Sequence, residues 1–503
     1  MKRFTLSKDI YSNIGRLKDI MNHSFDIKVR DFKIGLSNKR AAILYIENLA
    51  QEDMILDHIL KPLMYESTPL LKQTGEVDFQ KIKDCLVTIG SVDAVKTFDR
   101  IVLGIMSGDT FLSIEGSKEG LLINVREYHG KQFSTPSMEP SVKGPQEAFI
   151  ETLKQNIGLI HKRLRDPNLV FESYQLGRRT KQDAVLAFIK DIADPDIVDE
   201  VRRRVDAIDV DGLESATQIG LLMSEKPNSI FPLVQTTERP SRLVSALLAG
   251  RVAVLLNGSP DAILLPTTLP TLLQSVDDYL ENWIAASVIR ISRYVALFIS
   301  ALFPALYIAI TSFHPGMLPT NLVLSITATR TGVPFPAFVE AILMELALEL
   351  PQEAGIRLLR VVGQTVSIVG GLVIGQAAVQ AGVVSPIMVI IISITAVASY
   401  TIPDYSLSLA TRIVRIPFMV LGVTLGTFGI VMGMLLLLTY LSSLKSVGVR
   451  YLSPISPYRL GDWKDTFIRV HLTYMKKRPE LLNPQDIHRQ NTPTGKENSP
   501  NEN

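Results

Sequence analysis

Small and polar residues recur on one face of an uncharged stretch, residues 361–382, which is long enough to cross the hydrocarbon of a bilayer. On a helix turning about 100° per residue, six of them form one stripe: Gln364, Ser367, Gly371, Gly375, Ala378 and Gly382. The stripe predicts one of two roles: close packing against another helix, or the lining of a water-filled pore. Spacing alone favours packing, because small residues four apart are common in membrane helices that conduct nothing.

Three glutamates, Glu345, Glu349 and Glu353, recur every fourth residue ahead of this stretch and would share one face of a helix. The region around them, residues 320–356, is apolar in bulk but carries too many charges for a simple lipid-facing span. We therefore expect an in-plane or re-entrant arrangement there. The acidic face could form a vestibule that collects cations, although the solvated face of an interfacial helix is the simpler interpretation.

The sequence carries no pattern typical of catalysis. Its seven histidines are scattered, without HExxH or a Cys/His ligand spacing, and no Walker A run, GxGxxG fingerprint or GxSxG elbow is present. A net charge of +2 without a basic face argues against nucleic-acid binding. The one cysteine, Cys85, excludes an intrachain disulfide and fits a reducing compartment. We expect a protein that is not an enzyme, with no metal, cofactor or nucleic-acid partner.

The N-terminal half repeats itself at a constant offset, which places Lys33 over Gln175. The run KIGLSNKRAAILYIENLAQEDMILDHI from Lys33 aligns with QLGRRTKQDAVLAFIKDIADPDIVDEV from Gln175. The same offset aligns two pairs of glycines, Gly108 with Gly250 and Gly116 with Gly258. Each copy mixes strand-like and helical runs, so we expect two similar cytosolic α/β subdomains, 1–140 and 141–270. The two lobes could close around a ligand or act only as a scaffold.

The C-terminal half has the composition of an all-α multi-pass membrane domain, 294–441, reached through an amphipathic linker, 271–293. Its spans are expected near 294–313, 361–382, 384–402 and 416–441. The last span carries a second small stripe that invites packing with the first: Gly422, Gly426, Gly429 and Gly433. The basic tail, 442–503, should be cytosolic and disordered from about residue 483. Four crossings would then leave Arg412 and Arg415 outside, against the usual charge bias.

Four long runs carry a resemblance to a known family: PFPAFVEAILMELALELPQEAGIRL from Pro334, GQTVSIVGGLVIGQAAVQAGVVSPIMVI from Gly363, IPDYSLSLATRIVRIPF from Ile402 and YLSPISPYRLGDWKD from Tyr451. Together they strongly resemble the A subunit of the GerA-type germinant receptors of endospore-forming bacteria. The likeness extends over nearly the whole chain, and runs of this length are far more specific than a short motif.

The resemblance implies a protein of the spore inner membrane that works with a transporter-like B subunit and a lipoprotein C subunit. It also implies self-association into a ring within the lipid bilayer, and this favours pore lining over packing for the stripe in 361–382. The expected function is then a nutrient-gated channel whose cation release starts germination. The alternative is a non-conducting scaffold or signalling subunit. A secondary transporter is disfavoured, because the repeat lies in the cytosolic half and not among the spans.

Overall fold

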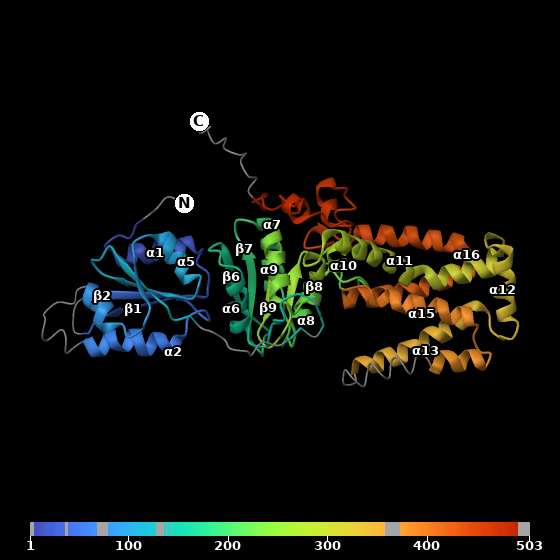
Figure 1. Ribbon diagram of the computed structural model, residues 1–503, viewed down its shortest axis with the longest axis horizontal. Helices are drawn as coiled ribbons and strands as arrows, with labels where there is room; N and C mark the ends of the chain where they lie inside the picture. Colours follow the sequence, from blue (N-terminus) through green and yellow to red (C-terminus); the bar gives the residue numbers. More distant parts are fainter. Residues whose placement is uncertain are drawn as a thin grey trace, which may run out of the picture.

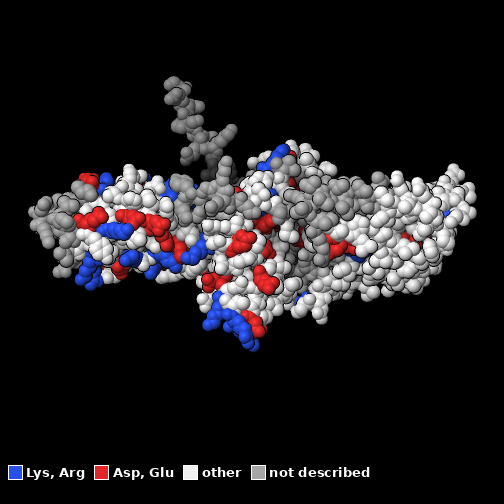
Figure 2. All heavy atoms as spheres, turned by 90° about the horizontal axis from the view of Figure 1, so that it is seen from below, with Lys and Arg blue, Asp and Glu red and all other residues white. Residues whose placement is uncertain are grey.

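The computed structural model describes residues 5–35, 39–67, 79–126, 135–136, 138–141, 143–357 and 373–490. Two α/β subdomains and a helical bundle follow one another along the long axis, and a C-terminal tail returns to the second subdomain (Figure 1). Charged side chains gather over the α/β part on the face shown in Figure 2, while the helical part is almost free of them.

The first subdomain is a five-stranded sheet in the order β1-β2-β4-β5-β3 with helices on both faces. Its strands are β1 Ile27–Lys33, β2 Arg40–Ile46, β3 Val92–Val95, β4 Thr110–Ile114 and β5 Gly120–Ile123. Its helical segments are α1 Ile10–Ile20, α2 Glu52–Ile55, η1 Leu56–Leu60, η2 Pro62–Glu66, α4 Phe79–Lys81, η3 Ile82–Leu86 and α5 Phe98–Ile105. Strand β2 is almost continuously apolar because Ala42 and Leu44 face α1 and α5, while Ala41 and Ile43 face the helices on the other side.

The second subdomain has the same topology, in the order β6-β7-β9-β10-β8. Its strands are β6 Leu169–Leu176, β7 Gln182–Ile189, β8 Gln235–Thr237, β9 Val252–Leu256 and β10 Ala262–Leu265. Its helices are α6 Leu153–Arg163, α7 Pro195–Asp206, α8 Ala216–Leu222 and α9 Pro240–Ala249. Helices α6 and α9 pack on one face of the sheet, and α7 and α8 pack on the other.

The predicted duplication is confirmed strand by strand. Strands β1, β2, β4 and β5 precede β6, β7, β9 and β10 by the same offset that separates Lys33 from Gln175. The paired glycines hold equivalent turns, since Gly108 and Gly250 have φ of 97° and 100° at the ends of α5 and α9. These left-handed conformations suit glycine, which has no Cβ to clash with the backbone. The offset read from the sequence is therefore the offset of the fold.

The helical bundle follows a short connection made of α10 Leu269–Leu273 and η4 Val276–Tyr279. It consists of α11 Trp283–Phe313, η5 Pro315–Met317, α12 Thr320–Arg330, α13 Ala337–Arg357, a helix at 373–380, α15 Pro386–Tyr400 and α16 Tyr405–Ser443. Among the described residues, α11 and α16 are long and apolar enough to cross a membrane. Helix α12 lies across the far end of the bundle, whereas α13 runs alongside α15 (Figure 1).

Helix α16 is two antiparallel arms that reverse at Gly426, where φ is 62° and ψ is −145°. Going along the first arm, Arg415 bonds to Ser300 near the middle of α11, and Gly426 lies against Phe313 at the far end. The second arm returns, because Ser443 accepts a hydrogen bond of 3.0 Å from Lys226 in the second subdomain.

This reversal corrects the expected membrane topology. The single span 416–441 is wrong, because that stretch is divided between the two arms. Arg412 and Arg415 lie on the arm that begins toward the subdomains, within a helix and not in a connector ahead of it. Helix α11 begins at Trp283, within the expected linker, and α13 is one continuous helix packed in the bundle.

The tail is ordered further than expected. After β11 Lys445–Ser446 and β12 Val449–Arg450 it contains three 3-10 turns, η6 Leu460–Asp465, η7 Leu472–Tyr474 and η8 Glu480–Leu482. The expected disorder from about residue 483 is wrong for residues 483–490. Asn483 donates to Asp194 over 3.1 Å, and the backbone N–H of Gln485 donates to the Ile192 carbonyl over 2.9 Å. The tail thus fastens the bundle to the second subdomain.

Candidate functional site

A cluster of charged side chains lies inside the helical bundle. Glu345 on α13 forms an ion pair with Arg415 on α16. The Arg415 side chain is only 3% exposed, and its Nε donates to the backbone oxygen of Ser300 on α11 over 2.7 Å. A further N–H of this guanidinium lies 3.2 Å from Ser300 Oγ. One arginine therefore joins three helices.

A second ion pair lies one turn away. Glu349 Oε1 is 3.2 Å from Arg412 Nη1, and the Arg412 guanidinium lies 5.9 Å from the ring centre of Tyr400 at the end of α15. The Glu349 side chain is 47% exposed, so solvent screens this pair more than the first. Glu353, the third glutamate of the predicted acidic face, also has an interaction partner.

Helix geometry explains why the pairs match. The two glutamates are four residues apart on α13 and the two arginines three apart on α16, and both separations are about one helical turn. A cavity of about 10 Å³, near the space of one water molecule, lies between the helices. Two of its lining atoms, Glu345 Oε2 and Gln352 Oε1, are buried without a hydrogen bond to the described protein. The cluster is neutral as a whole and has room for little more than a water.

A second buried carboxylate joins the helices at the far end of the bundle. The Glu340 side chain on α13 is 0% exposed, and its Oε1 lies 3.1 Å from Arg330 at the end of α12. Its Oε2 accepts the backbone N–H of Ser385 over 2.8 Å, just before α15. This carboxylate holds three helix ends together.

The predicted pore stripe is only partly within the described residues. Gln364, Ser367 and Gly371 lie outside them. A Cβ on Gly375 would lie 3.5 Å from Val389 on α15, and Ala378 packs against the bundle core. Gly382 has φ of 67° and ends the helix. Pore lining stays a prediction for this stripe.

The four glycines of the second stripe lie at close contacts, and among the described residues their nearest neighbours lie on α11, His314 and α16. A Cβ on Gly422 would lie 2.8 Å from the backbone oxygen of Ala305 on α11. A Cβ on Gly429 or Gly433 would lie 2.5 Å and 2.7 Å from atoms of Leu421 on the other arm of α16. Gly426 forms the reversal itself.

A buried pair of side chains and a close backbone contact lie at the junction of the two subdomains. His161 Nε2 on α6 lies 2.6 Å from Asp26 Oδ2, and both side chains are almost fully buried. A Cβ on Gly158 would meet the Asn48 carbonyl at 2.9 Å, so the backbones pack closely. Burial raises the pKa of Asp26, but the charge and hydrogen bonds of His161 and Ser24 outweigh burial, and the pKa lies below its ordinary value.

We expect Asp26→Ala to lower the free energy of unfolding by about 3–5 kcal/mol, because it leaves His161 buried without its partner. Thermal unfolding of the purified chain in detergent measures this. Asp19→Ala is the matched control, since the Asp19–His23 pair joins the same residue types but is 70% and 66% exposed. The control should change stability by less than about 1 kcal/mol. Equal effects of the two substitutions would contradict a stabilising role for the buried Asp26–His161 pair.

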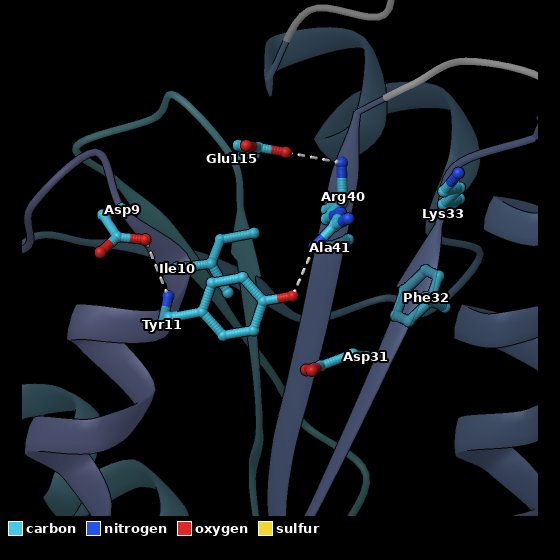
Figure 3. A pocket seen from close by; sticks show the side chains of 9 residues that line it. All are labelled: Asp9, Ile10, Tyr11, Asp31, Phe32, Lys33, Arg40, Ala41 and Glu115. Carbon is cyan, nitrogen blue, oxygen red and sulfur yellow. Dashed lines mark hydrogen bonds between the residues drawn. The ribbon is translucent and has the colours of Figure 1, made fainter.

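A cleft of about 190 Å³ lies on the first subdomain between the start of α1 and the end of the β1-β2 hairpin (Figure 3). Its polar groups bond to one another: Arg40 donates to the Tyr11 hydroxyl over 2.7 Å, and the backbone N–H of Arg40 donates to Glu115. Asp31 and Lys33, two residues apart on β1, also line the cleft. The positions equivalent to Asp31, Lys33, Arg40 and Glu115 are neutral in the second copy (Ser173, Gln175, Gln182 and Asn257), whereas Asp9 is matched by Glu151. Four of the five charged positions of this cleft are thus charged in the first copy alone.

No group of three or more His, Cys, Asp or Glu side chains lies close enough to hold a metal ion in the part of the chain that the structure describes. Among the described residues, we take the ion pairs inside the bundle as the candidate functional site. The sequence pointed to the glutamates through their spacing, but it did not identify Arg412 and Arg415 as their partners.

Comparison with known proteins agrees with the resemblance. The family described as "Bacillus/Clostridium GerA spore germination protein" matches residues 15–481. "Spore germination protein B1" of Bacillus subtilis (strain 168) is 37% identical over 96% of this chain and 99% of its own length. "Uncharacterized membrane protein YfkQ" of the same organism is 35% identical over 94% of this chain and 91% of its own.

A solved structure also matches the N-terminal half. The crystal structure of the N-terminal domain of the A subunit of the Bacillus megaterium spore germinant receptor GerK3 covers 52% of this chain and 97% of its own. The two are 28% identical, with a TM-score of 0.42. Because the family match and the similarity to these full-length relatives both extend over nearly the whole chain, this chain belongs to the GerA family of spore germination proteins.

Proposed function

We propose that this chain is the A subunit of a nutrient germinant receptor in the spore inner membrane, and that copies of it form a nutrient-gated cation channel. Family membership supports the receptor role, and the apolar helices support the membrane placement. The observation that carries the channel role is the neutral cluster of Glu345, Glu349, Arg412 and Arg415 inside the bundle. Ionisable groups among membrane helices are costly and commonly mark ion pathways.

The cluster suggests how gating could work. While each carboxylate is paired with an arginine, the cluster presents no net charge to a path between the helices. A movement of α16 relative to α13 would separate the pairs and leave fixed negative charge, which attracts cations. Nutrient binding in the complex shifts this equilibrium only by its differential affinity for the two arrangements. The transporter-like B subunit and the lipoprotein C subunit are the proposed partners.

The proposed topology has an even number of crossings. Helices α11, α13 and α15 and the two arms of α16 supply five, and the stretch 361–382 supplies the sixth. The chain then enters and leaves the bundle on the side of the subdomains, in the cytosol.

Potassium release from spores tests the proposal. A strain lacking only this chain should lose release in response to one class of nutrient and keep it for the others. Flux in a purified, reconstituted complex then separates a channel from a non-conducting scaffold. A complex that binds nutrient but passes no ions would overturn the channel role.

The stripe in 361–382 makes its own prediction. Gly371→Leu or Ser367→Leu should alter gating or cause leak, because bulk on the proposed pore face obstructs or props open the path. Val373→Leu is the matched control, since Val373 is 55% exposed. Normal potassium release in the Gly371→Leu strain, at wild-type protein level, would count against pore lining.

A further inference from the structure

Both tryptophans of the chain, Trp283 and Trp463, lie where the helical bundle meets the tail. The Trp463 ring lies 5.1 Å from Tyr458 and 5.2 Å from Phe467. The Phe467 ring in turn lies 4.6 Å from Tyr294 on α11. Tryptophan and tyrosine are enriched where a membrane protein passes from lipid to water. This row of rings therefore predicts that the interface lies at this level of the molecule.

The first turns of α11 place apolar side chains outside and charges inside. Ile284 and Val288 are 56% and 62% exposed. On the opposite face, Arg290 and Arg293 are buried in ion pairs with Asp278 at distances of 3.2 and 2.8 Å. Such an arrangement suits a helix whose outer face meets lipid, because lipid cannot solvate the charges.

The tail is bonded to α11 at the level of this apolar face. The backbone N–H of Arg469 donates to Ser287 Oγ over 3.0 Å. The Tyr294 hydroxyl donates to the Thr466 carbonyl over 3.4 Å. At a rise of about 1.5 Å per residue, these two bonds span roughly 10 Å of the helix. Residues 466–469 therefore lie at the depth where the outer face of α11 is apolar.

The outer surface of the tail is apolar and basic. Five large side chains are exposed by half or more: Tyr458, Leu460, Ile468, Leu472 and Tyr474. Three lysines of the same segment are also exposed: Lys464, Lys476 and Lys477. We call these eight residues the tail surface. Residues 444–490 hold nine Lys or Arg against four Asp or Glu, and a combination of apolar groups and excess positive charge fits an anionic bilayer.

We propose that the tail surface lies on the cytosolic face of the bilayer, with its apolar side chains at the acyl-chain boundary and its lysines against anionic phospholipid headgroups. The inference rests on the proposed membrane placement of the bundle. Because Gln485 of the same tail bonds to the second subdomain at Ile192, this contact would hold that subdomain at a fixed height above the membrane.

Spin labels on single cysteines test the contact in the full chain. Cys85→Ser removes the only native thiol, and labels are placed at Ile468→Cys, Leu472→Cys or Tyr474→Cys in vesicles of phosphatidylcholine with one quarter phosphatidylglycerol. We expect the ratio of oxygen to nickel-chelate accessibility to be several-fold higher than for Leu103→Cys. Leu103 is the matched control, because it is 60% exposed but lies on α5 of the first subdomain.

A label at Val295→Cys, on the exposed face of α11, separates the two proposals. A lipid-accessible label there, with tail labels as accessible to nickel as Leu103→Cys, would overturn the tail contact alone. A water-accessible label at Val295→Cys would overturn the membrane placement as well. Replacing Lys464, Lys476 and Lys477 by Glu should bring the Leu472→Cys ratio toward the control value, whereas Lys8, Lys118 and Lys181 replaced by Glu should leave it unchanged.

Discussion

Glu345→Arg is expected to unfold the bundle or prevent its assembly, and Arg415→Glu in the same chain is expected to restore it in part, because a carboxylate cannot donate the bond that Arg415 makes to the Ser300 carbonyl. The single substitution sets two guanidinium groups against each other where Arg415 is 3% exposed. Removing one partner of a buried pair costs about 3–5 kcal/mol, and adding a like charge costs more. The double variant re-forms the pair with its charges exchanged. Thermal unfolding of the purified chain and potassium release from spores measure the two effects.

The pair Glu349 and Arg412 is the matched control for this exchange. It joins the same two helices, but Glu349 is 47% exposed. Solvent screens the charge there, so Glu349→Arg should destabilise by about 1 kcal/mol or less. If Glu345→Arg were as stable as the wild type, or if the double variant were no better than the single one, α13 and α16 would not be joined by this pair.

The duplicated half could be predicted because its information is local and repeated. Short, nearly continuous apolar runs, glycines at turns and an unbroken offset indicate two copies of one sheet, and the tertiary packing agrees with them. The junction between the copies was not predictable. Asp26 and His161 are 135 residues apart, and nothing near either residue indicates the other.

The charged cluster was half predictable. The spacing of Glu345 and Glu349 indicates a shared face, but it does not say whether water, lipid or a cation lies opposite. The signal that was missed is a second pair of charges with one-turn spacing, Arg412 and Arg415, in another apolar helix. Two such pairs of opposite sign predict antiparallel helices in register, since each buried charge needs a partner.

The reversal in α16 was not predicted, because composition does not determine the backbone conformation of a single residue. Four glycines in steps of three and four suggest a packing stripe, and three of them do lie at close helix contacts. Nothing in their spacing distinguishes Gly426, whose φ of 62° turns the chain back, from its neighbours. Hydropathy adds no signal, because both arms are apolar on either side of the turn.

Gly426→Ala decides between the reversed arms and a straight helix by the sign of its effect. In the reversed chain, an alanine would take a backbone conformation that is almost restricted to glycine, which costs about 1–3 kcal/mol. Its Cβ would also lie 3.1 Å from Phe313. In a straight helix, the same substitution would stabilise by about 1 kcal/mol, because alanine is the better helix former. We expect a lower melting temperature in detergent, and a higher one would contradict the reversal. Gly316→Ala is the control, since a Cβ there meets nothing within 4 Å and should change stability by no more than about 0.5 kcal/mol.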